Sequence, residues 1–109
     1  MANPSKGPKE PGVQTLTRPK AEIKKPPMFR VVLHNDDYTT RDFVVDILQN
    51  VFGHAEPTAV RIMLQVHTTG SGTAGVFTRE IAEMKVQTVE ALAREREFPL
   101  RLSVEPGDV

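Results

Sequence analysis

The residues of this 109-residue chain with the clearest capacity for chemistry are four consecutive polar side chains, His34, Asn35, Asp36 and Asp37. Two carboxylates and an amide oxygen within one turn form an acceptor-rich site that suits a cation. The spacing argues against calcium, because it lacks the glycine and the glutamate that an EF-hand carries at its sixth and twelfth positions. Asn and Asp at such a place also hydrogen-bond their own backbone and cap a following helix. The string therefore predicts either a cation-binding loop or a purely structural turn.

His67 is the second candidate, and it stands at the edge of an apolar stripe near the end of a predicted helix. A histidine there interacts favourably with the negative end of the helix dipole, which is its structural interpretation. A metal site would also need His34 or His54 and a carboxylate, and the chain has no pair of histidines at i and i+4. We therefore expect no metal site.

A glycine-rich stretch at 70–75 matches the letters G-x-G-x-x-G. A dinucleotide-binding fingerprint has a strand before it and a helix after it, whereas this stretch follows a predicted helix and enters a predicted strand. The only serines beyond the first 26 residues, at 71 and 103, lie in no G-x-S-x-G nucleophile elbow. The sequence therefore predicts no cofactor and no enzymatic activity; a hydrolase that uses Asp36, Asp37 and His67 is the competing hypothesis.

The overall composition narrows the function further. Lys plus Arg and Asp plus Glu both number 14, and this balance argues against a dedicated nucleic-acid or membrane-surface binder. The absence of cysteine excludes disulfides and thiolate metal sites. No apolar run reaches the roughly 18 residues of a membrane span, and no signal peptide is recognisable. We expect a cytoplasmic, monomeric protein.

The first 26 residues differ in character from the rest of the chain. They hold five of the nine prolines, and six Lys or Arg against two Glu, with few side chains that could be buried. Such a segment cannot bury enough apolar surface to offset about 1–2 kcal/mol of backbone entropy per residue. We predict a disordered, Pro-rich, basic N-terminal arm over 1–26 and a folded, net acidic domain over 27–109.

Three segments of the folded domain predict strands. An aliphatic and β-branched run over 28–34 ends in turn-forming Asn and Asp residues, and shorter runs follow over 73–77 and 100–104. Three helical segments lie between them, which gives the order β-α-α-β-α-β. We therefore predict an α+β fold, a single two-layer domain with three helices packed on one face of a three-stranded sheet.

The helical segments show the 3.6-residue periodicity of helices that bury one face. Thr39 or Thr40 can cap the first helix, and Thr39 with Asp42 resembles a capping box. Pro57 suits the first turn of the second helix, which the glycines at 70–72 end. The positions expected to face inward are Phe43, Val44, Ile47, Leu48, Val51 and Phe52 in the first helix, Ala59, Ile62, Met63 and Val66 in the second, and Ile81, Ala82, Val86, Val89, Leu92 and Ala93 in the third.

Several strings in the folded domain resemble the signature of the ClpS adaptor family. They are Val31-Val32-Leu33-His34-Asn35-Asp36-Asp37-Tyr38-Thr39 with Phe43-Val44, Ile62-Met63-Leu64-Gln65-Val66-His67, Gly75-Val76-Phe77-Thr78 and Ala82-Glu83-Met84-Lys85-Val86. The match keeps consistent spacing over residues 27–105, and the arm carries none of it. The family's fold is a layer of helices on a three-stranded antiparallel sheet, which agrees with the elements predicted above.

The resemblance implies a non-catalytic adaptor without a cofactor. It binds substrates that begin with a free Leu, Phe, Tyr or Trp and delivers them to the ClpA unfoldase for degradation by the ClpP protease. Its partners are the N-domain of the unfoldase and the N-degron substrates, and a mobile N-terminal tail is engaged during delivery. By motif position, Asn35, Asp36 and His67 hold the substrate's α-amino group, Asp37 and Thr39 support them, Val44, Ile47, Met63 and Val66 line the pocket for the first side chain, and Tyr38, Glu80, Glu83 and Lys85 belong to the unfoldase-docking surface.

The chain departs from the family pattern at Thr40-Arg41, where the family usually has Pro-Met. In the family this Met is a gate that excludes β-branched first residues. Arg41 cannot line an apolar wall without desolvating its guanidinium, so we expect it to turn outward at the pocket rim. The ranking of Leu, Phe, Tyr and Trp and the exclusion of Ile and Val stay open.

A different class of protein also fits the predicted architecture. The C-terminal domain of the ribosomal stalk protein has the same order of elements and meets its factors through an acidic helical face, without a pocket. Asn35, Asp36 and His67 distinguish the two hypotheses, because a pocket-free interaction domain gives these residues no joint task.

Overall fold

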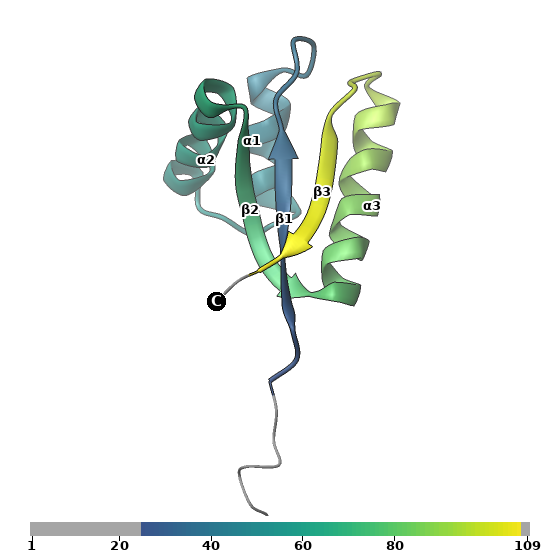
Figure 1. Cartoon of the computed structure of the whole chain (residues 1–109). Helices are drawn as coiled ribbons and strands as arrows, with labels where there is room; N and C mark the ends of the chain where they lie inside the picture. The colour runs from purple at the N-terminus through teal and green to yellow at the C-terminus, as the bar shows by residue number, and fades with distance from the viewer. Residues whose placement is uncertain (1–24, 108–109) are drawn as a thin grey trace, which may run out of the picture.

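The computed structural model describes residues 25–107, and its elements follow one another in the predicted order (Figure 1). Apart from two residues at 25–26, the predicted N-terminal arm lies outside the described residues. The helices within 25–107 are all too short or too polar to cross a membrane. The strands are β1 (Met28–His34), β2 (Ser71–Thr78) and β3 (Arg101–Pro106), and the helices are α1 (Arg41–Asn50), α2 (Glu56–Thr69) and α3 (Arg79–Glu95).

β1 is the middle strand of an antiparallel sheet with the order β2-β1-β3 (Figure 1). Successive side chains of a strand point to opposite faces, and Val31 and Leu33 are fully buried among residues of the helices. The register sets His34 opposite Ser71 on one side and Arg101 on the other. The residues that follow β1 therefore emerge between the first residues of the two outer strands. The predicted three-stranded antiparallel sheet with three helices is confirmed.

α3 packs on the sheet through a narrow line of mostly small side chains. Ala82, Val89 and Ala93 are buried, whereas Ile81 and Leu92 are 42% and 36% exposed. The prediction that Ile81 and Leu92 face inward is wrong. Each precedes a buried alanine by one residue and so lies about 100° away around the helix. The short alanine side chains bring α3 close to the sheet, and its flanking positions remain in solvent.

Of the two glycines after α2, Gly70 has the expected role and Gly72 does not. Gly70 ends the helix with a φ of 98°, in the left-handed region that favours glycine. Gly72 does not stop the helix but lies within β2, which begins two residues earlier than predicted. A Cβ atom at Gly72 would lie 2.9 Å from Cγ2 of Val66, so only glycine lets β2 pass this close to α2. β3 begins one residue later than predicted.

We predict that the centre of β1 sets the stability of the domain. Leu33→Ala should lower the free energy of unfolding by about 2–5 kcal/mol, because loss of this fully buried side chain leaves a cavity between sheet and helices. Leu64→Ala removes the same atoms from an exposed position on α2 and should change that free energy by at most about 0.5 kcal/mol. Urea unfolding measures both, and equal losses for the two variants would contradict this assignment of the core.

Candidate functional site

The loop at 35–40 connects the central strand to the first helix and contains most of the predicted site residues. β1 ends at His34 and α1 begins at Arg41. The backbone N–H of Asn35 donates to the carbonyl oxygen of Gly70 over 2.9 Å, which joins the loop to the C-terminal end of α2. The loop therefore lies at the end of the sheet where α1 begins and α2 ends (Figure 1).

The carboxylate of Asp36 organises this loop. Its Oδ1 accepts the backbone N–H groups of Tyr38 and Thr39, each over 2.7 Å, and its Oδ2 accepts the Thr39 hydroxyl over 2.7 Å. Partial burial raises the pKa of Asp36, but the hydrogen bonds from Thr39 and Tyr38 together outweigh burial, so the pKa lies below its usual value. The structural interpretation of the Asn-Asp string therefore holds for Asp36.

The two threonines at the end of the loop make different hydrogen bonds. The hydroxyl oxygen of Thr40 accepts the backbone N–H of Phe43 over 3.2 Å and so caps α1. The prediction of a capping box between Thr39 and Asp42 is wrong, because the Thr39 hydroxyl donates to Asp36 instead. Thr39 thus holds the loop, and Thr40 holds the first turn of the helix.

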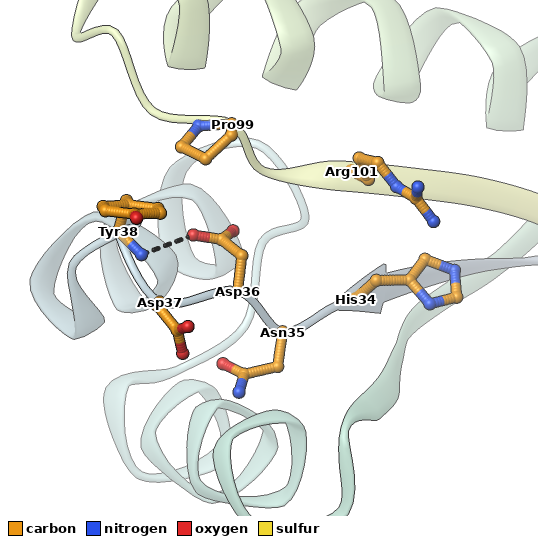
Figure 2. A pocket seen from close by; sticks show the side chains of 7 residues that line it. All are labelled: His34, Asn35, Asp36, Asp37, Tyr38, Pro99 and Arg101. Carbon is orange, nitrogen blue, oxygen red and sulfur yellow. Dashed lines mark hydrogen bonds between the residues drawn. The ribbon is translucent and has the colours of Figure 1, made fainter.

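Asn35 and Asp37 point to the opposite side of the loop from Asp36, as Figure 2 shows. The alternation is that of a strand continued past His34, before the chain bends at 37–39. Both side chains are exposed, and the hydrogen bonds that hold the loop within residues 25–107 use the carboxylate of Asp36 and leave that of Asp37 open. Two open acceptor groups therefore share one side of the loop, next to the end of α2.

His67 and Arg41 meet across the gap between α2 and α1. Nη2 of Arg41 lies 2.7 Å from Nε2 of His67. A guanidinium can only donate, so Nε2 is the acceptor and the ring proton lies on Nδ1. Arg41 is exposed, as expected, but it turns across the site toward α2 rather than outward. Within residues 25–107, no three His, Asp or Glu side chains gather as metal ligands would.

The four predicted pocket residues lie where α1 and α2 pack against each other and the sheet. Val44, Ile47 and Val66 are buried in the core, and Met63 is half-buried against it. Val44 lies one helical turn after Arg41 on α1, and Met63 lies one helical turn before His67 on α2. The two side chains therefore lie on the same faces of their helices as Arg41 and His67. The most accessible of the four is Met63, whose flexible thioether side chain changes shape readily.

A cavity of about 460 Å³ lies beside the loop, toward β3 (Figure 2). None of the four predicted pocket residues lines it. Sequence analysis missed its residues Pro99 and Arg101. Arg101 reaches the loop through the pairing of β3 with β1, for which no local sequence signal exists, and Pro99 lies two residues before β3. The lining residues are His34, Asn35, Asp36, Asp37, Tyr38, Pro99 and Arg101.

The residues predicted to dock an unfoldase lie at two ends of the sheet. Tyr38 is 74% exposed at the loop end. Glu80 lies near the start of α3, two residues after Thr78, which pairs with Met28 at the opposite end of β1 (Figure 1). Tyr38 therefore does not lie beside Glu80.

Two other predicted docking residues have partners inside the domain. Oε2 of Glu83 lies 3.2 Å from Nε of Arg79. Nζ of Lys85 donates to the carbonyl oxygen of Val51 over 2.7 Å and lies 5.6 Å from the centre of the Phe77 ring. Lys85 thus ties α3 to the end of α1, a structural role that the sequence did not indicate.

Comparisons with known proteins place the chain in a family. A family model described as ATP-dependent Clp protease adaptor protein ClpS matches residues 24–103. The chain is 56% identical over 96 residues to the ATP-dependent Clp protease adapter protein ClpS of Myxococcus xanthus, which covers 88% of this chain and 90% of that protein. It is 54% identical over 91 residues to the protein of the same name in Desulfatibacillum aliphaticivorans, with 84% and 88% covered.

A solved structure extends the likeness to three dimensions. The structure of Agrobacterium tumefaciens ClpS2 bound to L-phenylalaninamide matches this chain with a TM-score of 0.73 and 41% sequence identity, covering 76% of this chain and 100% of that one. The matched region of the family model contains the loop at 35–40, α1 and α2. On these matches and on its fold, the chain belongs to the ClpS family, the adaptor proteins of the ATP-dependent Clp protease.

Proposed function

We propose that this chain recognises the free N-terminus of proteins that begin with Leu, Phe, Tyr or Trp and delivers them to a ClpA-type unfoldase for degradation by ClpP. The observation that carries the proposal is a set of acceptors at the loop end of the sheet, with Asn35 and Asp37 on the loop and His67 in the last turn of α2. The Agrobacterium tumefaciens relative supports it, because its ligand L-phenylalaninamide has both a free α-amino group and a Phe side chain.

The charge of the substrate's N-terminus matches these acceptors. A free α-amino group has a pKa near 8 and at pH 7 is mostly an ammonium with three N–H donors. Oδ1 of Asn35, the carboxylate of Asp37 and Nε2 of His67 supply three acceptors. The carboxylate of Asp36 is already used by the loop. We therefore assign the ammonium contact to Asp37 and the supporting role to Asp36, the reverse of the order that the family resemblance implies.

The substrate's first side chain enters between α1 and α2. Met63 moves aside there, and Val44, Ile47 and Val66 form the apolar wall. Charge-assisted hydrogen bonds contribute about 1.5–3 kcal/mol each, and burial of a Leu or Phe side chain contributes a similar amount. Association costs at least about 4 kcal/mol. We therefore expect dissociation constants near micromolar, which correspond to a binding free energy of about −8 kcal/mol.

We assign contact with the unfoldase to the exposed beginning of α3. Glu80 and Glu83 present carboxylates to solvent there. Lys85 is half-buried and fixes this part of α3 against the end of α1 through its bond to Val51. The acceptor set lies at the other end of the sheet, so a substrate and an unfoldase can be bound at the same time.

The first prediction concerns the free amine. A peptide that begins with Phe should bind with near-micromolar affinity, and its N-acetylated copy should bind at least about 100-fold more weakly, because acetylation removes the positive charge and two of the three N–H donors, so that acceptors of the site are left without a partner in the complex. Fluorescence anisotropy measures both, with copies that begin with Leu, Trp, Ile and Met. Equal binding of the two Phe peptides would contradict the ammonium site. Binding of none of the peptides would favour the interaction domain of ribosomal-stalk architecture.

The second prediction separates the two aspartates. Asp37→Asn should weaken binding of the Phe peptide about tenfold or more and leave the free energy of unfolding within about 0.5 kcal/mol, because its carboxylate supports no loop hydrogen bond. Asp36→Asn should lower the free energy of unfolding by about 0.5–2 kcal/mol, as the loss of a cap does.

The pH dependence follows from the lowered pKa of Asp36. A carboxyl whose pKa is lowered by folding contributes stability above its unfolded pKa of about 3.9, and this contribution is lost as the pH falls through the folded pKa. The stability difference between wild type and Asp36→Asn should therefore be present at pH 7 and shrink below about pH 4. Urea unfolding at pH 7 and below about pH 4 measures this difference. A difference that grows in acid would overturn the assignment.

A further prediction concerns delivery. Glu80→Lys should weaken binding to the isolated N-domain of a ClpA-type unfoldase about tenfold, because it reverses a charge on the proposed docking surface. Glu95→Lys, at the other end of α3, makes the same change in net charge and should have little effect. Calorimetry measures both, and unchanged affinity for the Phe peptide confirms folding. Equal losses for the two variants would contradict this docking surface.

A further inference from the structure

Arg41 occupies one of the three acceptors that the proposed function gives to the substrate. Its Nη2 donates to Nε2 of His67 over 2.7 Å. A neutral imidazole has one acceptor nitrogen, so Nε2 cannot accept from Arg41 and from a substrate ammonium at the same time. The guanidinium is itself a cationic N–H donor, and in the free protein it occupies the acceptor that the substrate ammonium would use. A substrate must therefore displace Arg41.

The displaced guanidinium stays close to the bound N-terminus. Arg41 is the first residue of α1, and α1 is fixed by the Thr40 cap and by buried side chains from Phe43 onward. The side chain can turn away from His67, but its Cα cannot leave the rim. Among the carboxylates in residues 25–107, ion pairs form at Arg30–Glu105 and Arg79–Glu83 and none forms with Arg41. In the complex, the positive charge of the displaced guanidinium thus lies near the positive charge of the substrate ammonium. No carboxylate of the described residues pairs with Arg41.

The substrate's second side chain is the group best placed to supply a negative charge. Consecutive Cα atoms lie 3.8 Å apart, and successive side chains of an extended segment point in opposite directions. When the first side chain enters the apolar site between α1 and α2, the second points back toward the rim. The rim is where Arg41 lies.

We propose that Arg41 is a specificity-determining residue that selects N-terminal segments whose second residue is Asp or Glu. This inference rests on the proposed function, because it uses the same acceptors and the same orientation of the substrate. A carboxylate on the second residue pairs with the displaced guanidinium and separates it from the ammonium. A Lys or Arg at that position adds a third positive charge.

The test compares three peptides that begin Phe-Asp, Phe-Ala and Phe-Lys and are otherwise identical. For the wild-type full chain, affinity should fall from Phe-Asp to Phe-Ala to Phe-Lys by about 1.5- to fivefold at each step, the range for ion pairs near a surface. The span should narrow in 0.5 M NaCl, because salt screens exposed charges.

Substitution of Arg41 should remove this ranking of the affinities for the three peptides. Arg41→Met should bind Phe-Ala more tightly than wild type does, since no cation then competes for His67, and should lose the preference for Phe-Asp over Phe-Ala. Arg61→Met is the matched control, because Arg61 is exposed on α2 and its loss makes the same change in net charge. The control should keep the wild-type order.

The outcomes separate this inference from the proposed function. If wild type binds free-amine peptides and rejects the acetylated copy, but ignores the second residue, the inference is overturned and the proposed function stands. The inference also fails if Arg61→Met removes the preference as fully as Arg41→Met does, because a general charge effect then explains it. If wild type binds no free-amine peptide, both are overturned.

Discussion

The carboxylate of Asp36 holds three donors of the turn that comes after β1, and the arrangement of the whole site depends on this turn. The turn brings the chain from the middle of the sheet to the start of α1, and it exposes the side chains on either side of Asp36. These three hydrogen bonds fix the bend at 37–39, and together with the bond from Asn35 to Gly70 they set the directions of Asn35 and Asp37. A group to which the proposed function gives no direct contact with the substrate thus determines where the acceptors point.

The position of β1 in the middle of the sheet explains why the site forms at its end. β2 and β3 both begin beside His34, so their first residues surround the loop, and the end of α2 is held to it by the bond from Asn35 to Gly70. The apolar residues assigned to the pocket belong to the same core that stabilises the domain. Val44 and Val66 therefore cannot change for the sake of specificity without a cost in stability. Met63, which is only half-buried, is free of that constraint.

The sequence predicted the fold well because the apolar periodicity of α1 and α2 is strong and the turn residues between elements are distinctive. It failed for Ile81 and Leu92, because periodicity gives the direction of a helix face but not its width, and small alanines made the buried line of α3 narrow. Within the site, the sequence could place Asp36 and Asp37 together but not say which one the loop uses. That depends on the alternation of an extended backbone and on Thr39, whose partner no pattern of letters reveals.

The contact between Arg41 and His67 was also beyond the sequence, because the two residues are 26 positions apart on different helices. This contact changes how the rim of the proposed pocket can discriminate among substrates. An apolar side chain at the rim acts by shape and discriminates among first residues, whereas a guanidinium acts by charge over several ångströms and is weakened by salt. On the proposed function, discrimination among Leu, Phe, Tyr and Trp would depend on the buried wall of the pocket, where one methylene group alters affinity by about 10- to 200-fold. On the proposed function, the wall would therefore select the first residue by its size, and the rim would select the second residue by its charge.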